Sequence, residues 1–314
     1  MTRSLETVLV TGGAGFIGSH VVDRLVAQGH EVVVVDDLSS GKRENLARHA
    51  DDRRLRLIVA DLREDFAAAL AGVRPAAVVH LAAQVSVPRS IEDPVGDLDL
   101  NLRASVRVLQ WAAGAGARRV VLASSAAVYG EPARVPVSED MCDRPVSPYG
   151  ASKRAAELFF ACLGPTLGVE TVALRPFNVY GPRQDPRSTY SGVVSQFLAR
   201  GAAGEPLVVL GDGEQTRDFV YVEDVARAFV AAIDGAAIDG LIANLGSGHG
   251  CTIAALAREV VAVTGSASPV VTGPARAGDI ARSLAECSRA AARLGWHAEV
   301  SLGEGLRRTL AWLG

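Results

Sequence analysis

Three residues in the middle of the chain have the types and the spacing of an acid–base group. Ser125 ends the apolar run RRVVLASS, and Tyr149 and Lys153 lie four residues apart in SPYGASKRAAE. Residues four apart share one face of a helix, so the phenol and the ammonium would be neighbours. Tyrosine has an ordinary pKa of about 10 and is a poor base at neutral pH, but cationic neighbours would keep the phenol ionised. The spacing alone is equally typical of an ordinary amphipathic helix, so the group needs a cofactor and a substrate around it.

The first half of the chain supplies a scaffold for this group, because strand-like and helix-like segments alternate in it. Alternation of this kind predicts an α/β fold with a doubly wound parallel sheet of the Rossmann type, on which ligands bind outside the carboxyl ends of the strands. Ser125 ends one of these strands. The second half is less regular and predicts a smaller mixed α/β lobe. We therefore expect a nucleotide-binding domain over 1–175 and a substrate lobe over 176–314, some segments of which return to the first domain. The expected strands are Thr7–Thr11, Glu31–Asp36, Leu55–Asp61, Ala76–Ala82 and Arg118–Ser125, with helices at Ile17–Gln28 and Ser147–Leu167.

A glycine-rich loop, TGGAGFIG, lies between the first strand and the first helix. Gly12, Gly15 and Gly18 would let backbone amides approach a pyrophosphate, which the helix N-terminus also attracts. Asp36, at the end of the second strand, has the position of the acid that binds an adenosine ribose. Asp36 and Asp37 together would repel a 2′-phosphate, which favours NAD over NADP. A tight strand–helix turn without a ligand is the alternative, and the strand, loop, helix and acid in sequence argue against it.

With NAD in place, the acid–base group has a reaction to perform. Tyr149 would take the proton of a substrate hydroxyl while hydride leaves the same carbon for NAD, and Ser125 would hold or relay that proton. Asp61 is a candidate contact for the adenine. Leu81, Ala82 and Ala83 end the fourth strand and could pass close to the cofactor. Small residues there fit a close approach of the backbone, although core packing would explain them equally well.

Composition narrows the remaining classes. The chain has 314 residues, 49% of them hydrophobic, and a net charge of −3. That balance, with no dense basic run, predicts no nucleic-acid partner. The four cysteines form no CxxC pair or Cys/His cluster, which favours reduced thiols over disulfides and predicts no metal site. Neither a signal peptide nor an apolar run of membrane-spanning length is evident, so we expect a cytoplasmic protein with no membrane partner.

Five motifs together resemble the extended short-chain dehydrogenase/reductase family, in its nucleotide-sugar epimerase and dehydratase branch. They are TGGAGFIG, SSAAVYG, SPYGASK, RPFNVYGPRQDP and GDGEQTRDFVYVEDV. The similarity runs from about Val8 to the C-terminus and is strongest to UDP-glucose 4-epimerases. It implies tightly bound NAD, a UDP-sugar substrate and a homodimer built on the helices Asp97–Ala113 and Pro148–Leu167. The sequence alone would also allow the apolar surface of these helices to be buried inside one chain.

The resemblance also implies roles for individual residues. Ser125 is the catalytic serine, Tyr149 the base, and Lys153 the lysine that also holds the nicotinamide ribose. Around the cofactor it implies Gly12, Gly15, Phe16, Ile17, Gly18, Asp36, Asp37, Ser40, Gly41, Asp61, Leu62, Leu81, Ala82, Ala83, Asn101 and Phe177. Around the nucleotide sugar it implies Asn178, Arg217 and Arg276 on the diphosphate, Asp279 beside the uridine ribose, and Val193.

Three reactions share this scaffold: 4-epimerisation, 4,6-dehydration and decarboxylation of a uronate. Dehydratases typically carry Asp-Glu directly after the serine or threonine, and here Ala126 and Ala127 stand there and cannot transfer protons. The glutamate usual in decarboxylases is missing from this segment too. Elimination therefore favours a 4-epimerase, although Glu131 lies a few residues further along. A dehydratase or a UDP-glucuronate 4-epimerase stays an alternative, and so does an NAD-binding sensor, although sensors commonly lose the tyrosine or lysine that this chain keeps.

The sugar is indicated by two further places. Ser283 stands where a bulky aromatic excludes N-acetyl groups in some relatives, so UDP-GlcNAc and UDP-GalNAc are expected alongside UDP-glucose and UDP-galactose. The segment STYSG, 188–192, is expected to line the sugar pocket and has no arginine for a uronate carboxylate, although Arg187 is adjacent.

Overall fold

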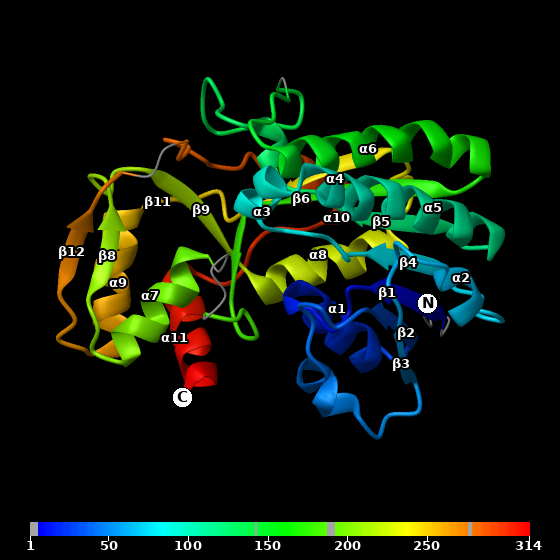
Figure 1. Ribbon diagram of the computed structural model, residues 1–314, viewed down its shortest axis with the longest axis horizontal. Coiled ribbons are helices and arrows are strands. Elements are labelled where there is room, and N and C mark those ends of the chain that lie inside the picture. Colours follow the sequence, from blue (N-terminus) through cyan, green and yellow to red (C-terminus); the bar gives the residue numbers. More distant parts are fainter. Residues whose placement is uncertain (1–5, 142, 187–191, 276–277) are drawn as a thin grey trace. The chain divides into compact units, whose positions relative to one another are not determined.

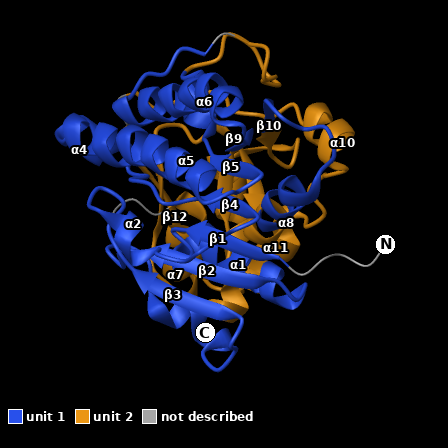
Figure 2. Cartoon of the chain, turned by 90° about the vertical axis from the view of Figure 1, so that its right-hand side faces the viewer, with its two compact units in different colours: residues 1–130, 143–175, 226–243 blue, residues 131–142, 176–225, 244–314 orange. Residues whose placement is uncertain are grey.

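The computed structural model describes residues 6–141, 143–186, 192–275 and 278–314. The chain forms two compact units, coloured separately in Figure 2. Unit 1 comprises Met1–Gly130, Asp143–Arg175 and Ala226–Ala243, and unit 2 comprises Glu131–Cys142, Pro176–Val225 and Asn244–Gly314. The units are therefore interleaved in sequence, because 131–142 and 226–243 each cross the expected boundary at 175/176.

Unit 1 is built on a seven-stranded sheet in the order β10-β6-β5-β4-β1-β2-β3. The paired neighbours from β3 across to β6 run parallel. This order reverses direction between β1 and β4, which is the topology of a doubly wound nucleotide-binding sheet. The expected fold class is thus confirmed. The strands are β1 Thr7–Thr11, β2 Glu31–Asp36, β3 Leu55–Val59, β4 Ala77–His80, β5 Arg119–Ala123, β6 Glu170–Pro176 and β10 Leu241–Leu245.

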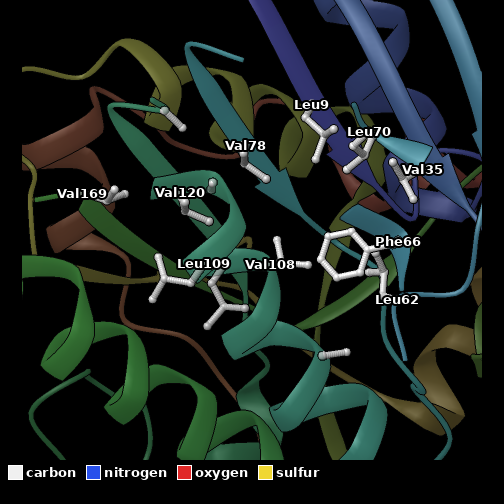
Figure 3. Packing of buried hydrophobic residues seen from close by; sticks show 14 of the residues in the cluster. Leu9, Val35, Leu62, Phe66, Leu70, Val78, Val108, Leu109, Val120 and Val169 are labelled. Carbon is white, nitrogen blue, oxygen red and sulfur yellow. The ribbon is translucent and has the colours of Figure 1, made fainter. Parts of the chain in front are cut away.

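Both faces of this sheet are buried, which explains why its strands read as unbroken apolar runs. In β1, Leu9 belongs to a cluster with Val78 and Val120 on one face (Figure 3), while Val8 and Val10 point to the other and are equally buried. Figure 1 shows helices α5 and α6 along one face and α1 and α8 along the other. The helices of unit 1 are α1 Phe16–Ala27, α2 Phe66–Ala69, α3 Val87–Glu92, α4 Pro94–Leu98, α5 Ala104–Gly114, α6 Pro148–Leu167 and most of α8 Val222–Asp234, with 3₁₀ segments η1 Arg43–His49 and η3 Ala126–Tyr129.

The expected helix Asp97–Ala113 is not a regular α-helix. A π-helical turn, η2 Asp99–Arg103, separates α4 from α5. Inside this turn Asn101 is fully buried, and the hydroxyl of Ser105 donates a hydrogen bond of 2.7 Å to its carbonyl oxygen. Turns of this kind are rare and often occur at functional sites. The break therefore directs attention to Asn101, which the sequence had placed near the cofactor.

Unit 2 has its own hydrophobic core. A three-stranded sheet, β11-β9-β7, and a parallel pair, β12-β8, pack with helices α7, α9 and α11 around Tyr180, Phe197 and Leu256. The unit is thus mixed α/β, as expected. Its elements are β7 Asn178–Tyr180, α7 Val193–Ala202, β8 Leu207–Leu210, β9 Thr216–Tyr221, β11 Gly250–Thr252, α9 Ile253–Thr264, β12 Val270–Gly273, α10 Ser288–Leu294 and α11 Leu302–Leu313.

Over the described ranges, no helix is both long enough and apolar enough to cross a membrane.

Candidate active site

The glycine loop joins β1 to α1 in unit 1 and is closed by backbone contacts. Gly12 has φ +69°, and a Cβ there would lie 2.6 Å from the amide nitrogen of Ala82. A Cβ on Gly18 would lie 2.1 Å from the carbonyl oxygen of Gly12. Gly15 is the N-cap of α1, and a Cβ there would lie 3.1 Å from the same carbonyl oxygen. These three positions therefore have little or no room for a side chain, and the loop presents the N-terminus of a twelve-residue helix, which suits a pyrophosphate.

Asp36 is held rigidly at the end of β2, beside this loop. Its carboxylate accepts hydrogen bonds of 2.9 Å from the backbone amides of Ala14 and Leu38, and it is 7% exposed. Each oxygen accepts one backbone hydrogen bond and keeps capacity for a ribose hydroxyl. Burial raises the pKa of Asp36, and the neighbouring charge of Asp37 adds to that rise. The two neighbouring carboxylates would both repel a 2′-phosphate, which fits the expected preference for NAD over NADP.

Gly41 makes room for that carboxylate. A Cβ on Gly41 would lie 2.6 Å from Oδ1 and 2.8 Å from Oδ2 of Asp36. Leu38, between the two, has φ +60°, a conformation that is uncommon outside glycine. The loop after β2 is therefore shaped around Asp36, and strained backbone of this kind is typical of binding sites.

Other expected cofactor residues have partners of their own. The carboxylate of Asp61 forms a two-pronged ion pair with Arg63, at 2.6 and 3.0 Å. That of Asp37 accepts from the amide of Ser39 at 2.9 Å. Leu62 belongs to the core cluster of unit 1. Of the remaining cofactor residues, Phe16 and Ile17 lie in the first turn of α1, Ser40 after β2, and Leu81, Ala82 and Ala83 directly after β4, whereas Phe177 is buried in unit 2.

The structure brings Ser125, Tyr149 and Lys153 together at the carboxyl end of β5. Ser125 is the N-cap of η3, where its Oγ accepts from the amide of Ala127 at 3.1 Å. Its hydroxyl also hydrogen-bonds the phenol of Tyr149. Ser147 caps α6, so that Tyr149 lies in the first turn of the helix and Lys153 one turn further on. The geometry is that of an acid–base group at the ligand-binding edge of the sheet.

The electrostatics of the tyrosine differ from the expectation. Burial raises the pKa of Tyr149, and the negative charge of Asp97 raises it further, against a lowering by the Ser125 hydrogen bond. Lys153 is also buried, and this lowers its pKa to about 8 despite the nearby carboxylates of Asp97 and Glu157. The protein's own groups therefore raise the pKa of the phenol above its ordinary value, because burial outweighs the hydrogen bond from Ser125. Of the two cations in the expectation, the nicotinamide ring remains the one that could lower this pKa.

Two rows of polar residues flank the Ser125–Tyr149–Lys153 group. The sequence analysis identified neither row as a set. On α6, Glu157 follows Tyr149 and Lys153 at the same four-residue spacing. It accepts from Arg175 at 2.7 and 2.8 Å and from the hydroxyl of Ser124. Ser124 is thus a structural residue, whereas Ser125 is free to face the phenol.

The second row runs through α4, η2 and α5, again at four-residue intervals: Asp97, Asn101 and Ser105. Asn101 is fixed by Gln84, whose amide donates to its Oδ1 and whose carbonyl accepts from its Nδ2, both at 2.9 Å. The sequence signal that could have identified this row is a set of polar residues that recur every four positions among apolar ones. Asn101 therefore holds the loop after β4 in place from inside the fold.

His80 links this second row to the nucleotide loop. Its Nδ1 lies 2.6 Å from Oγ1 of Thr11, and its Nε2 lies 2.8 Å from Oγ of Ser105. Because Ser105 donates to the carbonyl of Asn101, it accepts from Nε2, and Nδ1 accepts from Thr11. Full burial lowers the pKa of His80 to about 3. The ring is therefore a neutral connector and not a base.

In unit 2 the structure brings two of the expected substrate residues together. The guanidinium of Arg217, in β9, pairs with the carboxylate of Asp279 and donates to the carbonyl of Ile280 at 2.6 Å. Asn178, the first residue of β7, is exposed, and Val193 begins α7. Arg276, Arg187 and all of the STYSG segment except Gly192 lie outside the described residues.

Asp218, next to Arg217, is a further residue that sequence reasoning missed. It is fully buried and accepts four hydrogen bonds of 2.7–3.1 Å, from the amide and hydroxyl of Ser247 and the amides of Gly248 and Ala285. A carboxylate with so many donors fixes the loop after β10 against β9. Two adjacent residues of the TRDF motif therefore have different roles: Arg217 forms an ion pair, and Asp218 holds the backbone in place.

The glycine loop, the acid at the end of β2 and the Ser–Tyr–Lys group on this sheet define a class of nucleotide-dependent enzymes that work on a carbon bearing a hydroxyl. The chain belongs to the NAD dependent epimerase/dehydratase family, whose model matches residues 8–246. Membership confirms the resemblance found in the sequence and the expected cofactor, NAD.

Individual relatives cover nearly the whole chain. A UDP-glucose 4-epimerase of Mycolicibacterium smegmatis is 42% identical over 96% of both chains. The Thermus thermophilus UDP-glucose 4-epimerase solved with NAD is 40% identical, with a TM-score of 0.89 over 98% of both chains. A UDP-N-acetylglucosamine 4-epimerase of Methanobrevibacter ruminantium, solved with UDP-N-acetylmuramic acid, is 36% identical, with a TM-score of 0.93 over 99% of both chains.

Proposed function

We propose that this protein is a UDP-hexose 4-epimerase that interconverts UDP-glucose and UDP-galactose. One observation carries the proposal: Ser125 hydrogen-bonds Tyr149, with Lys153 one turn along α6, while Ala126 and Ala127 follow the serine. This set can move the proton of a hydroxyl, but the two alanines cannot serve as the second acid–base pair that removal of water would require.

Unit 1 has the residues to hold NAD. We propose that the amides of the Gly12–Gly18 loop bind the pyrophosphate and that Asp36 binds the adenosine ribose, with the remaining cofactor contacts as expected from the sequence. The fit rests on the crowding around Gly12 and Gly18, where a Cβ would fill the cradle, and on the spare acceptor capacity of the Asp36 carboxylate. When bound in its oxidised form, NAD supplies a positively charged ring and the acceptor for the hydride of the sugar carbon.

The chain's own residues manage the proton. Since burial raises the pKa of Tyr149, the phenol carries its proton until positive charge beyond that of Lys153 comes close. Tyr149 then takes the proton of the C4 hydroxyl as hydride leaves C4. After the 4-keto sugar has rotated and its other face has taken the hydride back, Tyr149 returns the proton to the same oxygen. The hydroxyl of Ser125 donates to the phenolate and steadies it. Lys153 keeps a positive charge one helical turn away.

Unit 2 supplies the proposed nucleotide-sugar contacts. Arg217 and Arg276 would bind the diphosphate with Asn178, and Asp279 would accept from the uridine ribose, with Val193 at the start of α7 nearby. A guanidinium suits phosphate oxygens because its donors are fixed in a fork. The ion pair of Arg217 with Asp279 supports this assignment, because the two side chains already lie together at one place in unit 2.

The range of sugars is proposed from Ser283. Its side chain is small and only partly buried, and its amide donates to the carbonyl of Thr216 at 3.0 Å. A small residue there leaves space for an N-acetyl group, so we propose that UDP-GlcNAc and UDP-GalNAc are also interconverted. Ser283→Tyr should slow the N-acetylated pair much more than UDP-galactose. Equal slowing of both pairs would remove Ser283 from this role.

The test of the main proposal is product identity. NAD-loaded protein is incubated with UDP-galactose, and the mixture is separated by chromatography. UDP-glucose is the expected product, and Ser125→Ala in parallel shows that it comes from this site. Folded, NAD-loaded protein that interconverts no UDP-hexose would support a sensor instead, and a 4-keto-6-deoxy product would support a dehydratase.

We also propose a homodimer. The helices α4 and α6 of unit 1 pack together and carry large apolar side chains in solvent: Leu98 is 49%, Leu158 52% and Phe159 46% exposed. Apolar side chains that gather on packed helices are typical of protein–protein interaction sites.

The described cysteines Cys162, Cys251 and Cys287 are free thiols, which supports a proposed place in the reducing cytoplasm.

A further inference from the structure

A buried carboxylate that the proposed chemistry does not use lies behind the acid–base group. Asp97, in α4, is 1% exposed. It accepts hydrogen bonds from Oγ of Ser152 at 2.6 Å, Nε2 of Gln84 at 2.9 Å and Nδ2 of Asn101 at 3.0 Å. Its three partners come from α6, the loop after β4 and the π-helical turn. One side chain therefore ties together three segments of unit 1.

Ser152 connects Asp97 to the catalytic turn. It stands between Tyr149 and Lys153 in sequence, and its hydroxyl is 3.0 Å from the carbonyl oxygen of Tyr149 as well as 2.6 Å from Asp97. The Asp97 carboxylate is therefore connected through one hydroxyl to the backbone of Tyr149 in the first turn of α6. Lys153 follows Ser152 directly in the sequence, so the same connection reaches the residue that carries the ammonium.

We propose that Asp97 is a positioning residue of this active site: through Ser152 its buried carboxylate holds the part of α6 that carries Tyr149 and Lys153, and its negative charge acts on both side chains. The inference rests on the proposed function only where it gives Tyr149 a catalytic role. The hydrogen-bond geometry stands without it.

The other charged groups near the pair differ from Asp97 in their own partners. On α6, the carboxylate of Glu157 also raises the pKa of Lys153, but it is paired with the guanidinium of Arg175 at 2.7 Å. On β4, His80 faces Lys153 and stays neutral, because its pKa lies near 3. Asp97 has neutral hydrogen-bond partners, a hydroxyl and two amides, so its charge acts on the pair with little compensation. Accordingly it raises the pKa of both Tyr149 and Lys153.

The direction of the effect follows from this. A negative charge makes each proton of an interacting pair harder to remove, whichever group carries it. A neutral side chain in place of Asp97 should therefore lower both apparent pKa values of the Tyr149–Lys153 pair.

Asp97→Asn is a nearly isosteric test that can keep every hydrogen bond. The amide oxygen would accept from Gln84 and Asn101, and the amide nitrogen would donate to Oγ of Ser152. The hydroxyl of Ser152 would then donate to the carbonyl of Tyr149. Asp99→Asn is the matched control, because it removes a carboxylate two residues away that is 34% exposed and paired with Arg103 at 3.0 Å.

The readout is the ultraviolet absorbance of tyrosinate during a pH titration of NAD-loaded protein. Subtracting the same titration with Tyr149→Phe in each background isolates Tyr149. Asp97→Asn should move the midpoint down by about one pH unit, and Asp99→Asn should superimpose on the parent. An unmoved midpoint in Asp97→Asn overturns the proposal. No turnover is involved, so failure to convert UDP-hexoses would count against the proposed function and leave this test valid.

Ser152→Ala examines the positioning half and serves if Asp97→Asn does not fold. It keeps the charge and removes the tether. The tyrosinate midpoint should stay close to that of the parent, while kcat with UDP-galactose falls at least about tenfold through misplacement of the turn. A parental kcat would overturn the positioning role.

Discussion

Nζ of Lys153 donates a hydrogen bond of 3.0 Å to the carbonyl oxygen of Ala123, the last residue of β5. The contact joins the catalytic helix to the strand end that precedes Ser125. Burial of the ammonium lowers its pKa to about 8. The contact with Ala123 therefore fixes the side chain, while its burial makes its charge sensitive to pH.

Lys153→Met should remove one component of the pH dependence of stability. The pKa of Lys153 is about 8 in the fold and 10.5 ordinarily, so between these values the unfolded chain binds more protons than the native one. Unfolding then takes up a proton, and the free energy of unfolding rises with pH, by about 1.4 kcal/mol per pH unit at most. Urea denaturation at pH 8 and pH 10 measures this rise. The variant should lack it, and equal slopes in parent and variant would contradict the burial of the charge.

Tyr149→Phe removes the proposed base and leaves the ring. Positioned acid–base groups contribute about 10²–10⁴-fold, so kcat for UDP-galactose should fall by about that factor while NAD stays bound. Tyr221→Phe is the control, because this tyrosine belongs to unit 2, where its ring centroid lies 5.8 Å from the Arg308 guanidinium. The kcat of this variant should match that of the parent. Full activity in Tyr149→Phe would refute the assignment of the base.

Gly41→Ala should weaken NAD binding without unfolding the protein. The added Cβ would stand 2.6 Å from Oδ1 of Asp36, so the carboxylate must turn away from its ribose-binding position. Loss of a charge-assisted hydrogen bond is worth about 1.5–3 kcal/mol, which is about tenfold or more in affinity. Calorimetric titration of NAD-stripped protein measures this. Gly114→Ala, where nothing lies within 4 Å of the added atom, should bind NAD normally.

Glu157→Ala should destabilise unit 1 strongly. Glu157 is 2% and Arg175 1% exposed, and the pair lies 2.7 Å apart. Removal of one partner leaves a buried charge uncompensated, which typically costs about 3–5 kcal/mol. Asp99→Ala breaks the exposed pair with Arg103 and should cost less than about 1 kcal/mol. Urea midpoints compare the two, and similar losses would argue against a buried ion pair.

Phe159→Glu should dissociate the proposed dimer. The ring is 46% exposed on α6, and a carboxylate buried in the proposed apolar interface would lose its hydration without gaining a partner. Sedimentation velocity should show a monomer. Val59→Glu is the control on β3, where the valine is 49% exposed, and should sediment like the parent. A parental protein that is already monomeric would remove the dimer proposal.

The sequence was informative wherever function depends on local spacing. The TGGAGFIG loop requires glycines at fixed offsets, and the structure shows why at Gly12 and Gly18, where backbone atoms stand within 3 Å of any Cβ. Tyr149 and Lys153 could be paired because four residues make about one helical turn. The doubly wound fold followed from alternating apolar segments, and family membership confirmed the resemblance.

Only the tertiary structure decided which groups surround that acid–base pair. Gln84, Asp97 and Ser152 meet across three segments of chain, and nothing in their local spacing relates one segment to another. The same holds for desolvation, which raises the pKa of Tyr149 where the sequence suggested the opposite. Spacing along a helix is a property of neighbouring residues, whereas burial and long-range contacts depend on how the whole chain packs.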